Sequence, residues 1–207
     1  MPHPGIPTGA EQDYAYVLGL YLGDGCLSAA GRTYRLRITL DTAYSGIIEQ
    51  CCQAVRAVMP GRAVSRVARR DRAVDVSCYS NGWPELLPQH GPGRKHERPM
   101  ELTDWQRNLV TAHPHAFIKG LYHSDGCYVI NPTRAPSGRL YEYDRYFFSN
   151  VSDDLRELFC WACSLIGVET RRSNAKNVSV ARRASVAILN EFLGPKDGSG
   201  AWQRSSA

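Results

Sequence analysis

The first half of the chain opens with an apolar segment that predicts a helix. This segment, Glu11–Leu22, has an apolar, helical character and is followed by Asp24-Gly25. Arg32–Leu40 then alternates between apolar and polar positions, which is the pattern of a half-buried strand. Its polar positions hold arginine and threonine, so we expect this strand to carry a basic open face.

Further elements of the first half follow from the same two periodicities. Residues 44–59 place apolar side chains at helical spacing, which predicts an amphipathic helix. Two strand-like runs, Arg62–Arg70 and Ala73–Tyr79, are joined by a polar turn, and a short helix at WPELLP ends this half. The strand that should pair first with Arg32–Leu40 is only faintly indicated.

The second half repeats this order, with a longer loop, NPTRAPSG, between its first two strands. Pro114 suits the first turn of a helix, and Ser152 is expected to cap another. Leu158 and Leu165 are expected on the buried side of that second helix. The expected elements are a helix at 114–123, a strand at Arg139–Ser149, a helix at Asp153–Ile166, a hairpin of Val168–Arg172 and Val178–Arg182, and a helix at Ser185–Leu193.

The chain therefore predicts an α/β (α+β) protein built from two pseudo-symmetric repeats. Each repeat has the element order αββαββα, and a repeat of this kind determines the whole architecture. A segment rich in proline, glycine and histidine separates the two copies. The expected bounds are an N-terminal tail at 1–10, a first repeat at 11–87, a connector at 88–113, a second repeat at 114–196 and a C-terminal tail at 197–207.

Composition excludes several classes of protein. Of the 207 residues, 43% are hydrophobic, which is enough for a buried core. The longest apolar run, Tyr14–Gly23, is about half of the ~18 residues that a membrane span needs, and the N-terminus does not resemble a signal peptide. Seven cysteines without disulfide-scaffold spacing favour free thiols in a reducing compartment. We therefore expect a cytoplasmic protein without a membrane partner.

The basic residues are almost all arginine. Of the 25 basic residues, four are lysine and the others are arginine, and the net charge is +5. The planar guanidinium suits phosphate and guanine edges, which favours a nucleic-acid partner. A GC-rich coding bias would also replace lysine with arginine, so the count alone leaves both explanations open.

Two matching segments, VLGLYLGDG and IKGLYHSDG, each end in Asp-Gly, and the two aspartates lie 101 positions apart. In the first, Gly19 and Gly23 are four residues apart on one helix face, and Gly120 and Ser124 occupy the same places in the second. Small residues at this spacing let two helix backbones approach closely. Packing these faces together would bring the two helix ends, and both aspartates, side by side.

The paired aspartates, Asp24 and Asp125, predict one shared site on the pseudo-twofold axis. An isolated Asp-Gly pair is most often a plain turn, but two pairs at equivalent positions of a repeat favour a site. Two carboxylates this close repel each other, so one must be protonated or both must share cations. An oxygen-rich site of this kind suits Mg²⁺, which can activate water and stabilise a leaving phosphate oxygen.

The segments VLGLYLGDG and IKGLYHSDG, in this repeat order, resemble the two signature helices of the LAGLIDADG homing endonucleases in their single-chain, two-repeat form. The resemblance covers nearly the whole chain. It implies that each half contributes a curved four-stranded sheet and that the two sheets form a saddle over DNA. His123 and Leu22 depart from the family pattern, because one of its acidic residues would stand at those positions.

The resemblance also implies the chemistry of the site. Asp24 and Asp125 would be metal ligands, with the carbonyls of Gly23 and Ser124 as helpers. The metal would be Mg²⁺, with Ca²⁺ or Mn²⁺ as substitutes. The substrate would be double-stranded DNA, cut at a long pseudo-palindromic site by a monomer that associates with the nucleoid.

Two lysines occupy matched positions in the repeats. Lys95 follows Asp24 by 71 residues, and Lys196 follows Asp125 by the same number. In the resembled family, a basic residue near each metal site polarises the attacking water or offsets transition-state charge. The alternative is a pair of solvated lysines in Gly-Pro loops.

The open faces of the strands and their turns hold the candidate DNA contacts. A β-ribbon fits the major groove, where arginine binds guanine through two hydrogen bonds. Any single arginine could instead contact phosphate or be merely solvated. Asp75 is expected to point outward with these residues. The candidates are Arg35, Arg37, Thr39, Arg66, Arg70, Arg72, Ser77, Tyr79, Arg145, Arg171, Arg172 and Lys176.

Two functions from different classes stay open. The first is a site-specific endonuclease that makes a double-strand break. The second is a non-cleaving DNA-binding protein of the same fold, such as a transcription regulator or an intron maturase. Binding alone does not need paired carboxylates, so the presence of both aspartates favours the nuclease. A structural or protein-interaction role is a distant third.

Overall fold

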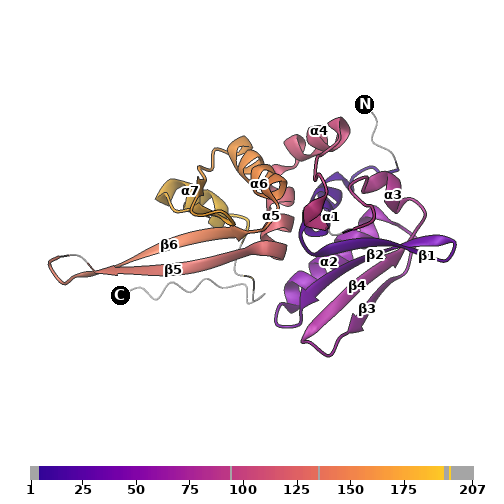
Figure 1. Ribbon diagram of the computed structural model, residues 1–207, viewed down its shortest axis with the longest axis horizontal. Coiled ribbons are helices and arrows are strands. Elements are labelled where there is room, and N and C mark those ends of the chain that lie inside the picture. Colours follow the sequence, from indigo (N-terminus) through magenta and orange to yellow (C-terminus); the bar gives the residue numbers. More distant parts are fainter. Residues whose placement is uncertain (1–4, 94, 135, 194–195, 197–207) are drawn as a thin grey trace.

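The computed structural model describes residues 5–93, 95–134, 136–193 and 196 (Figure 1). The predicted C-terminal tail at 197–207 and the first four residues of the predicted N-terminal tail lie outside this range. In chain order, the elements are α1 (Glu11–Asp24), β1 (Gly25–Ala30), β2 (Thr33–Asp41), α2 (Ser45–Val58), β3 (Val64–Ala68), β4 (Ala73–Tyr79), α3 (Trp83–Leu86), η1 (Lys95–Glu97), α4 (Asp104–Ala112), α5 (Pro114–Asp125), β5 (Gly126–Arg134), β6 (Leu140–Ser149), α6 (Asp153–Leu165), β7 (Arg171–Arg172), β8 (Asn177–Val180) and α7 (Arg183–Asn190).

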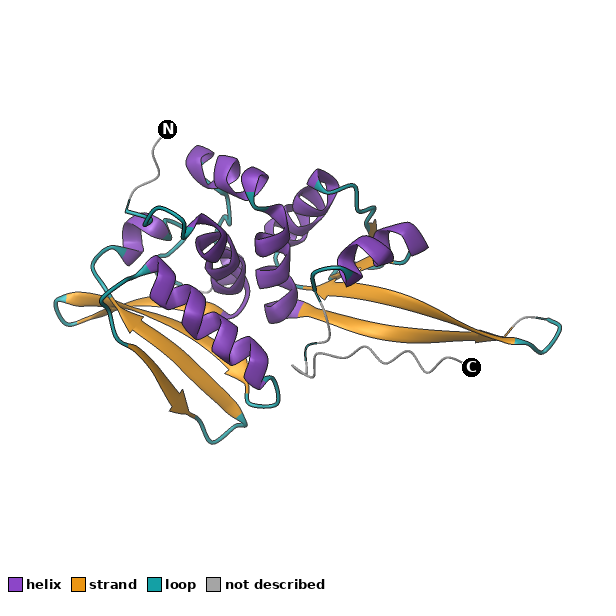
Figure 2. Ribbon diagram, turned by 180° about the vertical axis from the view of Figure 1, so that it is seen from behind, coloured by secondary structure: helices purple, strands orange, loops and turns teal. Residues whose placement is uncertain are grey.

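The strands form two four-stranded sheets with the same topology. Their orders are β1-β2-β4-β3 and β5-β6-β8-β7, and every neighbouring pair is antiparallel. The helices α1 and α5 lie side by side at the centre, and the two sheets extend from them to opposite sides (Figures 1 and 2). The predicted fold class of two equivalent α/β repeats is confirmed.

One face of each sheet is buried against helices. In the first half, Leu36, Ile38 and Val76 on this face are at most 1% exposed. In the second half, Phe148 is fully buried and stacks on Phe159 of α6, with ring centroids 4.6 Å apart. Burial of such side chains provides most of the stability of a layered fold. The sequence left the buried face of Arg139–Ser149 undecided, and the structure places Phe148 there.

Several boundaries differ from those expected. The strands that the sequence indicated only faintly are present as β1 and β5. Each begins at the glycine that directly follows its aspartate. Much of the predicted loop NPTRAPSG is strand, because β5 continues to Arg134 and pairs with β6. The edge strand β7 has two residues where five were expected, and Leu165 is 38% exposed and not buried. Ser152 caps α6 as predicted, since its hydroxyl accepts a hydrogen bond from the Leu155 amide.

None of the helices in the described part of the chain is long and apolar enough to cross a membrane.

Candidate active site and nucleic-acid interface

The contact between α1 and α5 depends on two glycines that have no room for a side chain. A Cβ atom on Gly19 would lie 2.6 Å from the Phe117 carbonyl oxygen and 2.9 Å from the Cα of Gly120. A Cβ atom on Gly120 would lie 3.0 Å from the Leu20 nitrogen and would collide with the Tyr16 carbonyl. The two helix backbones are therefore in direct contact, as the spacing of small residues predicts.

The same contact continues to the ends of both helices and brings the aspartates together. A Cβ atom on Gly23 would collide with the Ser124 side chain and with the Asp125 carboxylate. Asp24 is the last residue of α1 and Asp125 is the last residue of α5. The structure thus places all four small residues of the two segments at this contact, with both carboxylates at its end.

The environment of the two carboxylates raises both pKa values. Burial raises the pKa of Asp24 to about 6, and repulsion from Asp125 adds to this, while Lys196 and Lys95 oppose it. Burial also raises the pKa of Asp125, opposed by hydrogen bonds from Ser124 and Asn150. A neighbouring cation would relieve the repulsion and favour the charged form of both groups.

Lys95 closes one side of this site. Its Nζ donates to the carbonyl of Gly23 at 3.0 Å, to that of Gly25 at 2.5 Å and to that of Tyr21. The same atom lies 4.9 Å from the centroid of the Tyr21 ring. Burial lowers the pKa of Lys95 to about 8, although Asp24 and Asp125 favour its charged form. The ammonium is therefore held beside the first aspartate.

Lys196 occupies the corresponding place in the second half. Its Nζ donates to the Ser124 carbonyl at 3.3 Å and lies 5.4 Å from the centroid of the Tyr122 ring. Burial lowers its pKa, and Asp24 and Asp125 oppose this shift. Each lysine thus contacts the carbonyl that directly precedes one aspartate and the ring of a tyrosine in the same helix.

Asn150 is a site residue that sequence reasoning missed. Its side-chain Nδ2 donates to Oδ2 of Asp125 at 3.2 Å, and its Oδ1 accepts the Ser152 amide at 2.8 Å. Ser124 Oγ donates to the same oxygen of Asp125 at 3.1 Å. The position directly after β6 carries no sequence signal for this contact, because only the fold brings it to the end of α5.

The open face of the first sheet carries a network of hydrogen bonds. Arg35 donates to the Ser77 hydroxyl, from Nε at 3.1 Å and from a terminal nitrogen at 2.8 Å. Thr39 Oγ1 donates to the Asp75 carboxylate at 2.8 Å. Asp75 and Ser77 lie on the open face as expected, but they are only 7% and 1% exposed because these neighbours cover them. Tyr79 on the same face is 45% exposed.

Two predicted DNA contacts lie on the opposite face of their sheets. Arg66 pairs with Val76 in the ladder, and its guanidinium contacts Glu49 and Cys52 of α2. Arg172 forms ion pairs with Asp153 and Glu157 of α6, at 3.4 and 3.1 Å. The strand alternation that turns Ser65 toward the open face turns its neighbour Arg66 toward the helix. We therefore correct the prediction for both arginines.

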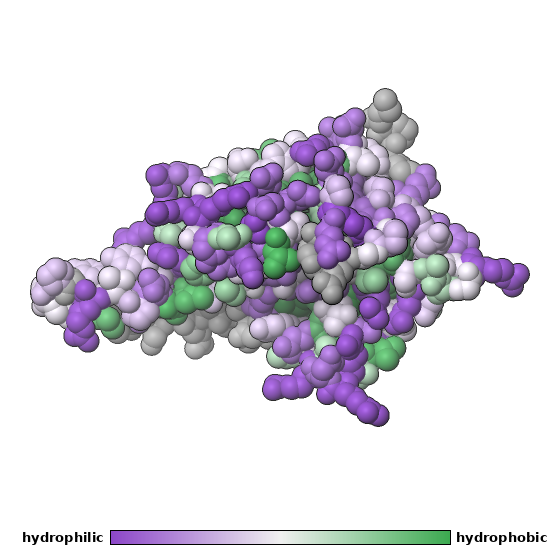
Figure 3. All heavy atoms as spheres, viewed as in Figure 1, coloured by the Kyte–Doolittle hydropathy of each residue, from purple (hydrophilic) through white to green (hydrophobic). Residues whose placement is uncertain are grey.

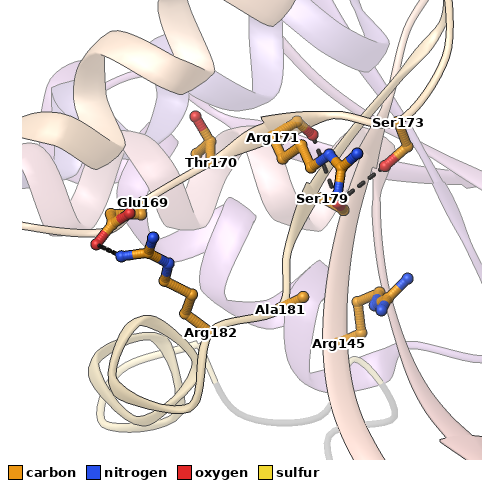
Figure 4. Close-up of a pocket in the computed structure, with 8 residues that line it drawn as sticks. All are labelled: Arg145, Glu169, Thr170, Arg171, Ser173, Ser179, Ala181 and Arg182. Carbon is orange, nitrogen blue, oxygen red and sulfur yellow. Dashed lines mark hydrogen bonds and ion pairs between the residues drawn. The ribbon is translucent and has the colours of Figure 1, made fainter.

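Other predicted basic contacts lie on the open face or in the turns. Arg145 and Arg171 line a hollow of about 670 Å³ at the outer part of the second sheet (Figure 4). Nε of Arg145 is buried, and within the described residues no group accepts a hydrogen bond from it. On the first sheet, Arg37 lies on the open face beside Arg35. Arg70, Arg72 and Lys176 lie in the turns that join the outer strands.

Comparison with solved structures identifies the fold. The chain superimposes on I-DmoI in complex with DNA and Mn with a TM-score of 0.57 and 16% identity, over 89% of this chain and 98% of that one. The chain has the two-repeat LAGLIDADG fold. It also matches I-AabMI bound to uncleaved DNA (TM-score 0.53, 11% identity, 86% of this chain and 82% of that one) and the K262A mutant of I-SmaMI (TM-score 0.56, 9% identity, 86% and 84%).

No protein-family model and no curated protein sequence matches the chain. The identities to the solved structures are low, so the LAGLIDADG fold is established by shape. The resemblance first seen in VLGLYLGDG and IKGLYHSDG is confirmed at the level of this fold.

The departures from the LAGLIDADG pattern have a structural explanation at His123. This residue is 6% exposed, and its Nδ1 lies 2.8 Å from the Tyr16 hydroxyl across the contact between α1 and α5. Burial lowers the pKa of His123 to about 3, so the ring is neutral. It therefore acts as a buried hydrogen-bonding group between the two helices. Lys119, one turn earlier in the same helix, is half-buried, and burial lowers its pKa.

The donor groups at the helix ends fit a hard divalent cation. They are two carboxylates and the carbonyls of Gly23 and Ser124, and all of these are oxygen ligands. Among the described residues, no group of three or more His, Cys, Asp or Glu side chains is placed so that it could hold a metal ion. Mg²⁺ is commonly held by one or two carboxylates, with waters and substrate phosphates completing the shell. The site thus suits a cation that binds together with a phosphate.

Proposed function

We propose that this protein is a metal-dependent, site-specific endonuclease for double-stranded DNA. The observation that carries the proposal is the pair of aspartates at the ends of two closely packed helices, each with a lysine on the adjacent backbone carbonyl. A pure DNA-binding protein needs neither the repelling carboxylates nor the two buried ammonium groups. One chain supplies both halves of this site, which suits a monomer acting on both strands.

The open faces of the two sheets support double-stranded DNA as the substrate. Among the described residues no helix covers either face, and both faces carry arginines, with Arg35 and Arg37 on one and Arg145 and Arg171 on the other. β-Ribbons can enter the major groove of DNA, where guanidinium groups bind guanine edges and phosphates. I-DmoI, which shares the fold, was solved with DNA and Mn and with DNA and Ca.

We assign Asp24 and Asp125 as the side-chain ligands of a divalent cation, with the Gly23 and Ser124 carbonyls beside them. The cation, when bound, supplies an activated water and charge stabilisation at the scissile phosphate. Lys95 and Lys196 place positive charge where negative charge develops during hydrolysis. The pKa of Lys95, about 8, lets this group give up or take up a proton near neutral pH. Mg²⁺ is the expected physiological ion, with Mn²⁺ or Ca²⁺ able to occupy the same oxygens.

The first test separates binding from chemistry. Duplexes would be selected from a random library in Ca²⁺, which supports binding while suppressing cleavage, and the enriched sequences would then be incubated with Mg²⁺. We expect one long enriched site, of about 20 base pairs, that is cut near its centre only after Mg²⁺ is added. A site that is enriched but stays intact would make the protein a DNA-binding member of this fold. No enrichment would exclude both functions.

Variants identify the groups responsible. Asp24→Asn and Asp125→Asn keep the side-chain shape and remove one charge, so we expect cleavage to fall at least about 1,000-fold. Binding in Ca²⁺ should change far less. Asp13→Asn, in the first turn of the same helix as Asp24, is the matched control and should cut normally. Loss of folding in both site variants would indicate a structural role for the pair.

A further inference from the structure

The β5–β6 hairpin carries a stripe of aromatic and arginine side chains along one strand. Every second residue from Arg139 to Phe147 belongs to it, and three neighbouring pairs are in contact. The guanidinium of Arg139 lies 5.2 Å from the centroid of the Tyr141 ring. The rings of Tyr141 and Tyr143 stack with their centroids 6.4 Å apart. The guanidinium of Arg145 lies 5.9 Å from the centroid of the Phe147 ring. We call these five residues the β6 stripe.

The β6 stripe lies on the open face of the second sheet. Tyr146 and Phe148, which alternate with it, are buried against the helices. In the ladder, Phe147 pairs with Ser179 and Arg145 pairs with Val129, and Ser179 lines the hollow of Figure 4 together with Arg145. The stripe is therefore continuous with the arginine-lined surface that we propose as the DNA interface.

Part of the β6 stripe exposes apolar surface to water. Tyr141 is 38% exposed, Tyr143 is 39% exposed, and the neighbouring Val129 is 41% exposed. In Figure 3 this hairpin is mostly pale with a few hydrophobic residues, whereas the outer turns of the first sheet are strongly hydrophilic. A contiguous exposed apolar strip on a monomeric protein marks a contact with a partner. Arginines interleaved with the rings indicate that this partner is negatively charged.

The hairpin also reaches farther than its counterpart. β5 has nine residues, whereas β1 has six. Three further residues extend a strand by roughly 10 Å, which corresponds to about three base pairs of duplex. The hairpin projects beyond α7, and no helix of the described part of the chain lies on its outer part (Figures 1 and 2). Tyr141 pairs with Thr133 near the end of the hairpin, so it would meet the outer end of one half-site. Tyr143 lies nearer the helices, because it lines a hollow together with Val186 and Asn190 of α7.

We propose that the β6 stripe recognises thymine methyl groups in the major groove of the half-site that the second repeat binds. This inference rests on the proposed function, because it assumes that the open faces bind duplex DNA. The C5-methyl group of thymine is the one apolar group on the base edges of the major groove. Tyrosine rings and Val129 can pack on methyl groups, while Arg139 and Arg145 contact phosphate or guanine. The first sheet, in contrast, offers hydrogen-bonding groups.

The test removes only the methyl groups. In the selected site, each thymine is replaced by deoxyuridine, first in one half and then in the other, and Kd is measured in Ca²⁺. Loss of one buried methyl group should weaken binding about fourfold, and several in one half should multiply this effect. We expect a strong effect in one half-site and less than about twofold in the other.

Protein variants assign the sensitive half to the β6 stripe. Tyr143→Ala should weaken binding to the thymine site and abolish its sensitivity to uracil, whereas Tyr143→Phe should retain both. Tyr79→Ala, which alters an exposed tyrosine on the first sheet, is the matched control and should leave the sensitivity unchanged. These residues are exposed, so an unaltered thermal transition would show that the fold is intact.

The outcomes separate this inference from the proposed function. If a duplex is enriched and cut but uracil is neutral in both halves, the inference is wrong and the endonuclease proposal stands. The inference is also wrong if uracil in either half weakens binding equally and Tyr143→Ala does not change this pattern. It is likewise wrong if the half-site bound by the second repeat contains no thymine. If no duplex is enriched, the proposed function itself fails.

Discussion

The two halves of this protein share one backbone plan but hold their aspartates differently. The backbone amides of Thr42 and Asn150 occupy equivalent places, because each donates to a carbonyl in the outer turn of its own sheet, Arg72 at 3.0 Å and Lys176 at 2.9 Å. Thr42 directs its hydroxyl to the same Arg72 carbonyl, at 2.9 Å. Asn150 instead directs its amide to Asp125.

The consequence is an asymmetric pair of carboxylates on a nearly symmetric scaffold. Asp125 accepts hydrogen bonds from Ser124 and Asn150, whereas no side chain among the described residues donates one to Asp24. Hydrogen bonds to the charged form of a carboxylate favour that form. Burial raises the pKa of both aspartates and both lysines oppose this, whereas the hydrogen bonds oppose only the shift at Asp125. Repeats preserve backbone positions more strictly than side-chain roles.

The open faces show the same contrast. The first sheet holds arginine and hydroxyl groups that are paired with one another, such as Arg35 with Ser77. The second holds tyrosine rings stacked along a longer hairpin, such as Tyr141 on Tyr143. If the proposed function holds, a single chain with two such halves would bind two half-sites of different chemistry. A homodimer, whose two halves are identical, could not do this.

The largest effect is expected where the halves do not differ. Gly19→Ala and Gly120→Ala each force a methyl group against the backbone of the facing helix, so each should destabilise the protein by about 3 kcal/mol or more. We expect similar losses for both, measured by chemical unfolding. Gly31→Ala, at a turn with φ of 63° and no atom within 4 Å, tests backbone strain without a clash and should cost less. Equal effects of all three variants would mean that the helix contact is looser than the structure shows.

The next effect concerns the support of the aspartates. Asn150→Ala removes a hydrogen bond from Asp125, and loss of such a supporting group should slow cleavage by about 10- to 100-fold. Thr42→Ala, at the equivalent position, should cut at nearly the normal rate. Cleavage of the selected duplex in Mg²⁺ is compared with its affinity in Ca²⁺, which should be unchanged. If both variants slow cleavage equally, the asymmetry of the site has no chemical consequence.

A smaller effect distinguishes the two faces of each sheet. Arg35→Ala and Arg171→Ala, on the open faces, should each weaken binding severalfold, and loss of a phosphate contact should reduce the slope of log K against log salt by about one. Arg66→Ala and Arg172→Ala, on the helix faces, should leave this slope unchanged. Binding titrations at several salt concentrations measure both quantities. A reduced slope for the second pair would contradict their placement.

The smallest effect is a pH dependence of stability without metal. A carboxyl group whose pKa is raised on folding stabilises the protein below its unfolded pKa and loses this contribution as pH rises through the folded pKa. For Asp24, the melting temperature should therefore fall from about pH 4 to about pH 6. Asp24→Asn should reduce this fall in melting temperature more than Asp125→Asn does, because hydrogen bonds oppose the pKa shift of Asp125. Identical profiles for wild type and both variants would refute this account.

The sequence alone determined the repeat, the helix contact and the two aspartates. These features follow from short-range periodicity, because small residues four positions apart and alternating strands recur in both halves. An internal repeat in the sequence predicts a repeated structure. The same periodicity predicted the basic face of β2, because Arg35 and Arg37 alternate with buried neighbours. The two lysines could be suspected because each follows its aspartate by the same number of residues in the sequence.

Only the tertiary structure decided which side chains share a site. Asn150 reaches Asp125 because the end of β6 is folded back against the end of α5, and no local pattern records that contact. Arg66 and Arg172 were misplaced because a short edge strand has no clear alternation, so its register comes from the neighbouring strand. Both faces of β6 carry aromatic residues, so only the packing of α6 shows which face is open. Side-chain roles across a sheet or between helices depend on partners that are distant in sequence.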